Sequence, residues 1–225
     1  MGFSFQWEQR YAENTHLSIW PWSDIVSLVH RHCKTIISDG RGRILELGCG
    51  AGANIPLFLS LRLEYFAIEG STTAVNFLHE QYPQLVNNIC IGDFTLDQPF
   101  DKPFDLVVDR ASLTHNSTSS IKKGLQSAFN SLAPGGLFVG TDWFSNNHTD
   151  YTGGDLVDDR YTKTNHITGQ FIGVGKVHFS DEEHLRDLFS QFEIIYMEEK
   201  VIKQYEPLTN HQFASWNIVA RRPFK

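Results

Sequence analysis

Three glycines at alternate positions, Gly48, Gly50 and Gly52, constrain the fold of this chain more than any other feature. They follow a short apolar run at 44–47, which is typical of a buried parallel strand, and precede a helix-compatible run that begins at Asn54. Glycine is needed where a chain turns sharply and lets a ligand approach bare backbone. A helix starting directly after such a turn points N–H groups and partial positive charge at that ligand. The segment therefore predicts a strand–loop–helix unit that binds a small molecule.

The spacing of these glycines alone permits two cofactors. Gly48-x-Gly50-x-x-Ala53 satisfies the dinucleotide fingerprint, whose last position can be alanine, and would indicate a nicotinamide-dependent oxidoreductase. Glu46-x-Gly48-x-Gly50-x-Gly52 resembles the signature of class I S-adenosylmethionine-dependent methyltransferases. In that family the loop passes under the methionine and ribose of the cofactor. The resemblance implies S-adenosylmethionine as the cofactor and S-adenosylhomocysteine as its product.

A carboxylate at the end of the second predicted strand is placed to bind a ribose. Glu69 ends the strand 65–69 and lies 17 residues beyond Gly52, close to the roughly 20 expected of a ribose-binding acid. Its two oxygens can accept hydrogen bonds from both ribose hydroxyls. The alternative is a surface glutamate at a strand end.

The other periodic segments predict one α/β domain over 1–225. Strands are predicted at 44–47, 65–69, 86–91, 104–109, 137–141, 192–196 and 213–220, and helices at 22–37, 55–61, 71–82 and 121–132, with a capped helix running to 189. The resemblance implies that these form the Rossmann-like class I methyltransferase fold. In that fold a seven-stranded, mostly parallel sheet has an antiparallel last strand and helices on both faces.

Most cofactor contacts are implied by the resemblance. An acid after the third strand takes the adenine amino group in that family, which assigns this role to Asp93, although a turn or cap is its alternative. The candidate cofactor-binding residues are Trp7, Tyr11, Glu46, Gly48, Cys49, Gly50, Gly52, Asn54, Glu69, Gly70, Ser71, Asp93, Phe94 and Asp109.

A narrower resemblance concerns the acceptor side. The run Asp-Arg-Ala-Ser-Leu at 109–113 is similar to the Asp-Arg-Gly-x-Leu stretch of thiopurine methyltransferase-like enzymes, with Ala111 in place of the glycine. Trp7-x-x-x-Tyr11 echoes their paired aromatic motif, with Tyr in place of the second Trp. The resemblance implies that Arg110 lies beside the reacting centre and stabilises an anionic substrate through its fixed fork of donors. A structural ion pair with Asp109 or Asp142 is the alternative.

Methyl transfer to a hydroxyl benefits from a general base with a pKa near 7. His115, just after the fourth strand, is the first candidate and His148 the second, although each histidine can also be structural. The candidate substrate-binding residues are Trp20, Asp142, Trp143 and His148. Asp142 and Asp109 could join in a metal site, but no third ligand is evident, so no metal is expected.

Two segments are predicted to build the acceptor pocket. Residues 1–22 are aromatic-rich and indicate an N-terminal flap or packing over a core edge. Residues 144–178 are polar, rich in glycine and without clear periodicity, which is typical of a functional or mobile stretch and suggests a lid.

Composition limits the partners. The net charge of −7 argues against a nucleic-acid binder, which needs a basic face. Three scattered cysteines fit a reducing compartment, and no apolar run approaches the roughly 20 residues of a membrane span. We therefore expect a cytoplasmic monomer or homodimer acting on a small-molecule acceptor. A non-catalytic subunit that binds the cofactor remains an alternative.

One further motif is set aside on its predicted structure. Tyr196-x-x-x-Lys200 has the spacing of a short-chain dehydrogenase dyad. However, 192–196 alternates like a strand, and that dyad must lie on one face of a helix.

Overall fold

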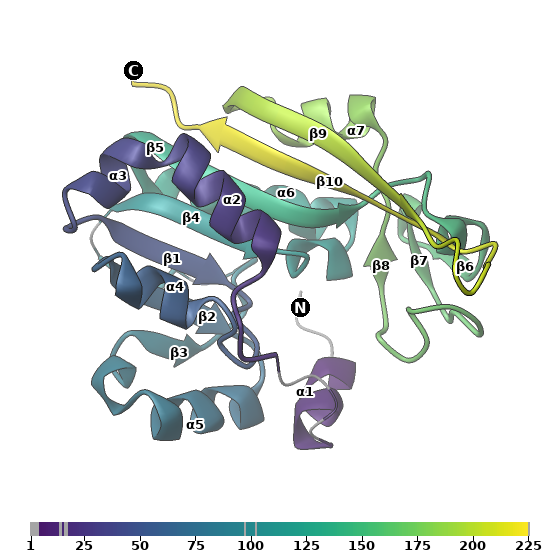
Figure 1. Cartoon of the computed structure of the whole chain (residues 1–225), viewed down its shortest axis with the longest axis horizontal. Helices are drawn as coiled ribbons and strands as arrows, with labels where there is room; N and C mark the ends of the chain where they lie inside the picture. The colour runs from purple at the N-terminus through teal and green to yellow at the C-terminus, as the bar shows by residue number, and fades with distance from the viewer. Residues whose placement is uncertain (1–4, 14, 16–17, 97, 102, 225) are drawn as a thin grey trace.

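Seven strands form one sheet with the strand before the glycine loop near its middle (Figure 1). The computed structural model describes residues 5–224 apart from 14, 16, 17, 97 and 102. The strands are β1 (Arg43–Leu47), β2 (Glu64–Glu69), β3 (Ile89–Ile91), β4 (Phe104–Arg110), β5 (Leu132–Phe144), β9 (Glu193–Lys203) and β10 (Gln212–Arg221), in the order β3-β2-β1-β4-β5-β10-β9. β1 to β5 pair in parallel, whereas β10 is antiparallel to both of its neighbours. The predicted mostly parallel sheet with an antiparallel last strand is confirmed.

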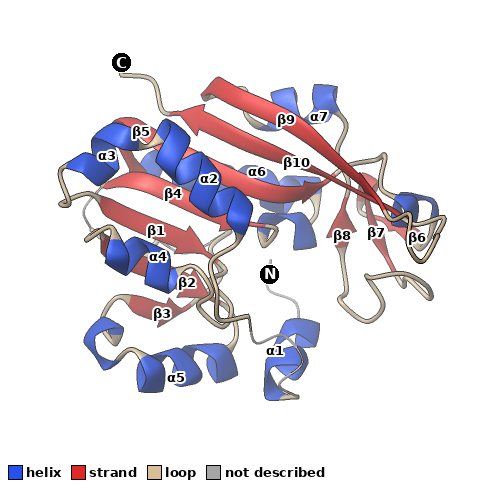
Figure 2. Ribbon diagram, viewed as in Figure 1, coloured by secondary structure: helices blue, strands red, loops and turns tan. Residues whose placement is uncertain are grey.

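Helices cover both faces of this sheet, as predicted (Figure 2). α2 (Ser23–His32), α3 (Lys34–Ser38), α4 (Ile55–Ser60) and α5 (Thr72–Gln81) contribute to one apolar cluster, and α6 (Thr118–Ser131) and α7 (Glu182–Leu188) to a second. Along β1, Ile44 belongs to the first cluster and Leu45 and Leu47 to the second, because successive side chains point to opposite faces of a strand. Glu46 therefore shares the face of Ile44. α1 (Phe5–Ala12) lies beside the carboxyl ends of the strands (Figure 1).

Several predicted boundaries differ from the structure. The predicted helix 22–37 is two helices, since the backbone of Cys33 (φ −103°, ψ 27°) leaves the helical region between α2 and α3. The predicted strand 86–91 begins only at Ile89, because the residues before it form the short 3₁₀ helix η1 (Pro83–Leu85) and a turn. β5 begins at Leu132 instead of 137, where paired backbone hydrogen bonds join Gly135 and Gly136 to Arg222.

The stretch 144–178 contains regular structure that its sequence does not indicate. It forms the 3₁₀ helix η3 (Thr149–Thr152) and the strands β6 (Asp155–Val157), β7 (Asp159–Thr164) and β8 (Val177–His178), which pair as a small antiparallel sheet. This sheet lies beyond the carboxyl end of β5 (Figure 1). No helix in the part of the chain that the structure describes is long and apolar enough to cross a membrane.

Candidate active site

A cavity of about 490 Å³ lies where the glycine loop meets the carboxyl ends of β1, β2 and β4. This volume falls within the range typical of small-molecule sites. The predicted site residues that line it are Trp7, Tyr11, Glu46, Gly48, Cys49, Gly50, Asn54, Glu69, Gly70, Asp93, Phe94, Arg110 and His115. The structure thus brings together, around one cavity, residues from segments far apart in the sequence.

Two glycines of the loop lie where side chains from other segments come close to the backbone. Gly50 (φ +54°) and Gly52 (φ +81°) have left-handed backbone conformations that favour glycine. A side chain at Gly50 would collide with the hydroxyl of Tyr11, which lies over the loop inside the cavity. A side chain at Gly52 would lie 2.5 Å from Leu78 of α5. The absence of a side chain at Gly50 therefore makes room for the Tyr11 hydroxyl, while Gly52 lets the loop pack on α5 and does not line the cavity.

Glu69 holds the loop and faces the cavity. Its Oε2 accepts a hydrogen bond from the Gly50 N–H at 2.8 Å, and its Oε1 accepts one from the Ser71 N–H at 2.9 Å. Glu69 is only 4% exposed, and burial raises its pKa above the usual value although these donors act against the rise. Ser71 caps α5 through a hydrogen bond from the Ala74 N–H and lies outside the cavity. The carboxylate of Glu69 is thus fixed at the cavity wall and does not point into water.

Glu46 is a second buried acid in the wall. Its Oε1 accepts a hydrogen bond from Asn54 Nδ2 at 2.8 Å, and its Oε2 accepts one from the Tyr65 hydroxyl at 2.6 Å. Asn54 Oδ1 in turn accepts the Trp22 N–H at 3.2 Å. Burial raises the pKa of Glu46 to about 7 in spite of these donors. Glu46 can therefore exchange a proton near neutral pH.

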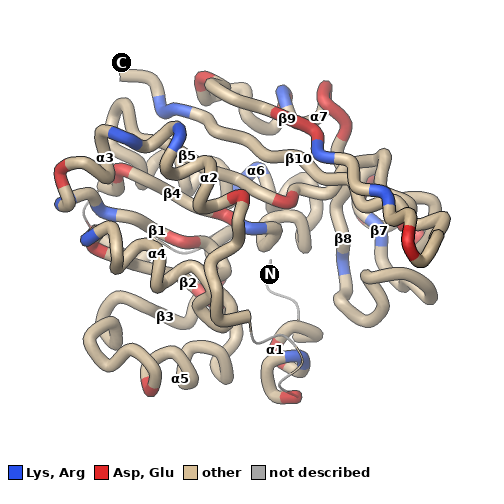
Figure 3. The backbone as a smooth tube through the Cα atoms, viewed as in Figure 1, with Lys and Arg blue, Asp and Glu red and all other residues tan. Residues whose placement is uncertain are grey.

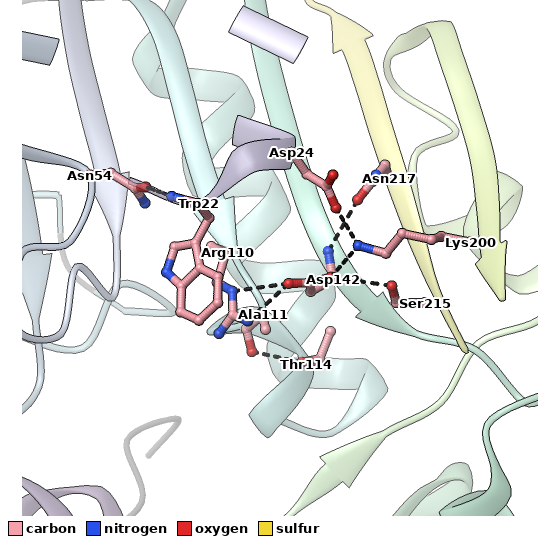
Figure 4. A network of polar contacts seen from close by, with 10 residues as sticks. All are labelled: Trp22, Asp24, Asn54, Arg110, Ala111, Thr114, Asp142, Lys200, Ser215 and Asn217. Carbon is pink, nitrogen blue, oxygen red and sulfur yellow. Dashed lines mark hydrogen bonds and ion pairs between the residues drawn. The ribbon is translucent and has the colours of Figure 1, made fainter. Parts of the chain in front are cut away.

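Arg110 also lines the cavity and belongs to a charged network (Figure 4). Its Nε and Nη2 lie 3.1 Å and 2.9 Å from Asp142 Oδ2, and its guanidinium carbon lies 3.7 Å from the centroid of the Trp22 ring. Lys200 Nζ lies 3.0 Å from Asp142 Oδ1 and also pairs with Asp24. Burial acts to raise the pKa of Asp142, but the charges of Arg110 and Lys200 outweigh it and hold the pKa below its usual value. Arg110 is therefore both part of a structural ion pair and part of the cavity wall.

Comparison with known proteins finds a methyltransferase domain within the chain. Residues 44–136 match the model of a family described as a methyltransferase domain. A malonyl-[acyl-carrier protein] O-methyltransferase of Chlorobium luteolum is 30% identical over 133 residues, which cover 55% of this chain and 47% of that protein. The chain thus spans about half the length of the curated relative it matches.

Solved structures agree with this match at the level of the fold. A methyltransferase of Methanosarcina mazei has a TM-score of 0.67 at 17% identity, with 83% of this chain and 94% of that chain covered. The N-methyltransferase NodS of Bradyrhizobium japonicum, in complex with S-adenosylhomocysteine, has a TM-score of 0.63 at 14% identity, with 98% and 100% covered. The [4+2]-cyclase SpnF has a TM-score of 0.64 at 15% identity, with 98% and 95% covered. The chain thus contains a region that matches a methyltransferase domain and has the fold of class I S-adenosylmethionine-dependent methyltransferases.

His115 lies at the cavity in a defined tautomer. Its Nδ1 lies 2.9 Å from the carbonyl oxygen of Lys176, and its ring packs edge-on against Trp7 at 4.8 Å between centroids. A carbonyl oxygen only accepts, so Nδ1 carries the proton and Nε2 of the neutral ring holds the lone pair. The arrangement is compatible with the predicted role of general base, and Lys176 gives the stretch 144–178 a contact with the site.

The N-terminal helix α1 is held to the start of α5 by hydrogen bonds. Glu8 accepts hydrogen bonds from Ser71 Oγ and Thr73 Oγ1, each at 2.5 Å, at the start of α5. Arg10 donates to the carbonyl oxygen of Ile172. Residues 1–4, 14, 16 and 17 of the predicted flap lie outside the described residues.

Several predicted site residues lie away from the cavity. Asp109 is buried and accepts hydrogen bonds from Trp143 Nε1 at 2.7 Å, from the Leu113 N–H at 3.0 Å and from Ser112, while burial raises its pKa to about 6. Its carboxylate therefore lies in the protein interior, hydrogen-bonded to Trp143 and away from the cavity. Trp20 is 74% exposed, and Asp142 reaches the cavity only through Arg110.

His148 is also placed away from the cavity. It is buried among Phe144, Phe171 and Phe213, and burial lowers its pKa to about 4. The roles predicted for His148 and for the other residues outside the cavity stay predictions.

Three contributors were not predicted from the sequence. Trp22 lines the cavity and stacks on Arg110, Tyr65 binds Glu46, and Lys200 completes the ion pairs of Asp142. Alternation along β2 could have placed Tyr65 on the same sheet face as Glu46, since their strands are adjacent. No local pattern marks the partner of Lys200, which lies 58 residues away in the sequence.

Proposed function

We propose that this chain transfers a methyl group from S-adenosylmethionine to a small-molecule acceptor. The observation that carries the proposal is the carboxylate of Glu69, which is fixed at the cavity wall between the N–H groups of Gly50 and Ser71. There it can accept hydrogen bonds from the cofactor's ribose. Asp93 and Phe94 line the same cavity beyond β3 and suit the adenine ring. The bound cofactor would supply the electrophilic methyl group.

Three further residues of the cavity wall suit the binding of an acceptor. Arg110 and Trp22 offer a guanidinium fork and an aromatic face, and the His115 imidazole is the candidate base. His115 would take the proton of a hydroxyl acceptor, whereas an amine or a thiolate would not need it. Holding the acceptor in line with the methyl group and away from water would supply much of the acceleration.

A small molecule is the acceptor class that the charge distribution favours. Basic and acidic residues are interspersed along the backbone (Figure 3), and the net charge of the chain is −7. A nucleic-acid acceptor would be expected to need a basic face. The positive charge of Arg110 is already balanced by Asp142, so the acceptor need not be an anion.

Two measurements test the proposal. Equilibrium binding should give micromolar affinity for S-adenosylhomocysteine and none for NAD(H), whereas the reverse would support an oxidoreductase. A labelled-methyl assay should then be run with thiols, phenols, amines, carboxylates and sugar hydroxyls. Cofactor binding with no transfer to any acceptor class would instead support a non-catalytic subunit.

Cofactor affinity should depend on the ionisation of Glu46. The pKa of Glu46 is raised to about 7, so in the cofactor-free protein the carboxyl is protonated below that pH. The amino group of the bound cofactor would favour the carboxylate, so binding should release a proton. Affinity for S-adenosylhomocysteine should therefore fall as the pH drops below about 7, approaching tenfold per pH unit, and level off above it.

Titration calorimetry between pH 5.5 and pH 8.5 checks this dependence. Glu46→Gln cannot ionise at this position and should flatten the dependence of affinity on pH. If the dependence persists in this variant, it arises from another group such as Asp109, whose pKa is raised to about 6. A flat profile in the parent protein would show that Glu46 does not face the amino group.

The hydrogen bonds that hold α1 to the start of α5 are expected to slow the release of the cofactor. Glu8→Gln would weaken the charge-assisted hydrogen bonds from Ser71 and Thr73. We expect the dissociation rate of S-adenosylhomocysteine to rise about 5- to 30-fold, which corresponds to roughly 1–2 kcal/mol. Stopped-flow displacement measures this rate, and Glu13→Gln near the end of the same segment is the matched control. An unchanged rate would mean that α1 does not limit release.

A further inference from the structure

A cluster of two histidines and one aspartate lies behind the cavity wall, outside the proposed cofactor site. His148 and Asp150 belong to the start of η3, and His211 directly precedes β10. One nitrogen of each histidine and one carboxylate oxygen of Asp150 all lie within 4.8 Å of one another. The pair His211 Nε2 and Asp150 Oδ1 is 3.6 Å apart.

His148 gives a second, independent sign of a ligand. The residue is 1% exposed, and its Nε2 has no hydrogen bond of normal geometry among the described residues, although the Gln170 side chain lies close to the ring. Its Nδ1 accepts the Asp150 N–H at 3.0 Å, so the proton of the neutral ring lies on Nε2. A buried N–H without an acceptor is costly and rare in folded proteins. A ligand at this nitrogen would remove that cost.

We propose that His148, Asp150 and His211 bind a divalent transition-metal ion, with zinc as the best match. Two imidazoles and one carboxylate form a common ligand set for zinc, whereas magnesium and calcium prefer oxygen ligands alone. Ligands at 2.0–2.1 Å in tetrahedral geometry lie about 3.3 Å apart, so His211 and Asp150 need to approach by a few tenths of an ångström, and His148, within 4.8 Å of both, by up to about 1.5 Å. Three protein ligands leave one position for water.

The surroundings already orient the carboxylate. Asp150 Oδ2 accepts a hydrogen bond from the Gln170 N–H at 2.9 Å. The other carboxylate oxygen, Oδ1, faces His211. Such outer contacts fix ligand orientation in metal sites. Coordination by His148 Nε2 moves its ring proton to Nδ1, so the Asp150 N–H must release that nitrogen. Metal binding therefore includes a small shift of the first turn of η3.

The ion would join segments that the main sheet does not join. It would link η3 to the turn between β9 and β10. This link lies next to Phe144, whose ring centroid is 5.9 Å from that of His115 in the cavity wall. The site would thus stabilise the wall behind the cavity. It departs from the sequence-based expectation of no metal, because His211 lies 61 residues from Asp150 and no local spacing marks the set. The proposal does not depend on methyl transfer.

Metal titration of the untagged, chelator-treated chain tests the site directly. Cobalt(II) should give visible d–d absorption that saturates at one ion per chain, and zinc should displace it. Zinc at a hundred times its Kd should raise Tm by roughly 5–10 °C. His211→Gln removes one ligand at a half-exposed position and should weaken zinc binding about 100-fold or more.

Two further variants complete the test. Asp150→Asn should also weaken zinc binding, whereas His30→Gln, an exposed histidine on α2, should bind zinc as the parent does. Circular dichroism confirms that each variant is folded. The proposal is overturned if the parent shows neither cobalt absorption nor a shift in Tm. It is equally overturned if His211→Gln binds zinc as tightly as the parent.

Discussion

Replacing Glu69 with alanine is expected to weaken binding of S-adenosylhomocysteine by about 10- to 150-fold, or roughly 1.5–3 kcal/mol. The substitution removes the proposed acceptor of the ribose hydroxyls. It also leaves the buried N–H groups of Gly50 and Ser71 without their carboxylate, so the glycine loop loses the contact that fixes it. Both effects act on cofactor affinity in the same direction. Isothermal titration of the folded variant measures the loss.

A second glutamate on the same strand is the matched control. Glu64 begins β2 and pairs with Arg43 at the surface, where its side chain is 55% exposed. Glu64→Ala should therefore leave affinity within about twofold of the parent, because exposed ion pairs contribute little. If Glu69→Ala binds as tightly as Glu64→Ala, Glu69 does not hold the ribose.

The central sheet could be predicted because its signals are local. The buried strands are mostly apolar, and the loop glycines occupy positions with positive φ that few other residues adopt. The small sheet of β6, β7 and β8 could not be predicted, since strands of two to six residues are too short to show a period. The break at Cys33 has no glycine or proline to mark it.

Site residues were predicted well where their position along a strand places them at the cavity. They were predicted poorly where the direction of the side chain decides whether it reaches the cavity. Asp109 and Arg110 are consecutive on β4, so their side chains point to opposite faces. Arg110 lines the cavity, whereas Asp109 turns inward to Trp143. The sequence resemblance had placed Asp109 at the cofactor and Arg110 beside the reacting centre. Contacts such as that of Lys200 with Asp142 depend on strand pairing across the sheet, which local sequence does not encode.

Arg110→Ala should leave binding of S-adenosylhomocysteine within about twofold of the parent and lower methyl turnover about 100-fold with an acceptor found by screening. Among the described residues Arg110 pairs with Asp142 and makes no hydrogen bond or ion pair with Glu69 or Glu46, which are proposed to hold the cofactor. Its guanidinium is held in one orientation by Asp142 and the Trp22 ring, which suits it to position an acceptor. Single-turnover assays and calorimetry separate the two effects.

The structure also indicates why this variant should fold. Asp142 keeps Lys200 as a counter-ion at 3.0 Å after Arg110 is removed, so no buried carboxylate is left without a positive partner. Arg186→Ala, which removes an exposed arginine paired with Glu182 on α7, is the matched control and should retain full turnover. Arg110→Lys keeps the charge but loses the planar fork, so turnover between those of alanine and the parent would assign the effect to geometry as well as charge. Full turnover in Arg110→Ala would restrict Arg110 to its ion pair with Asp142, and the acceptor would then have to be positioned by Trp22 and His115.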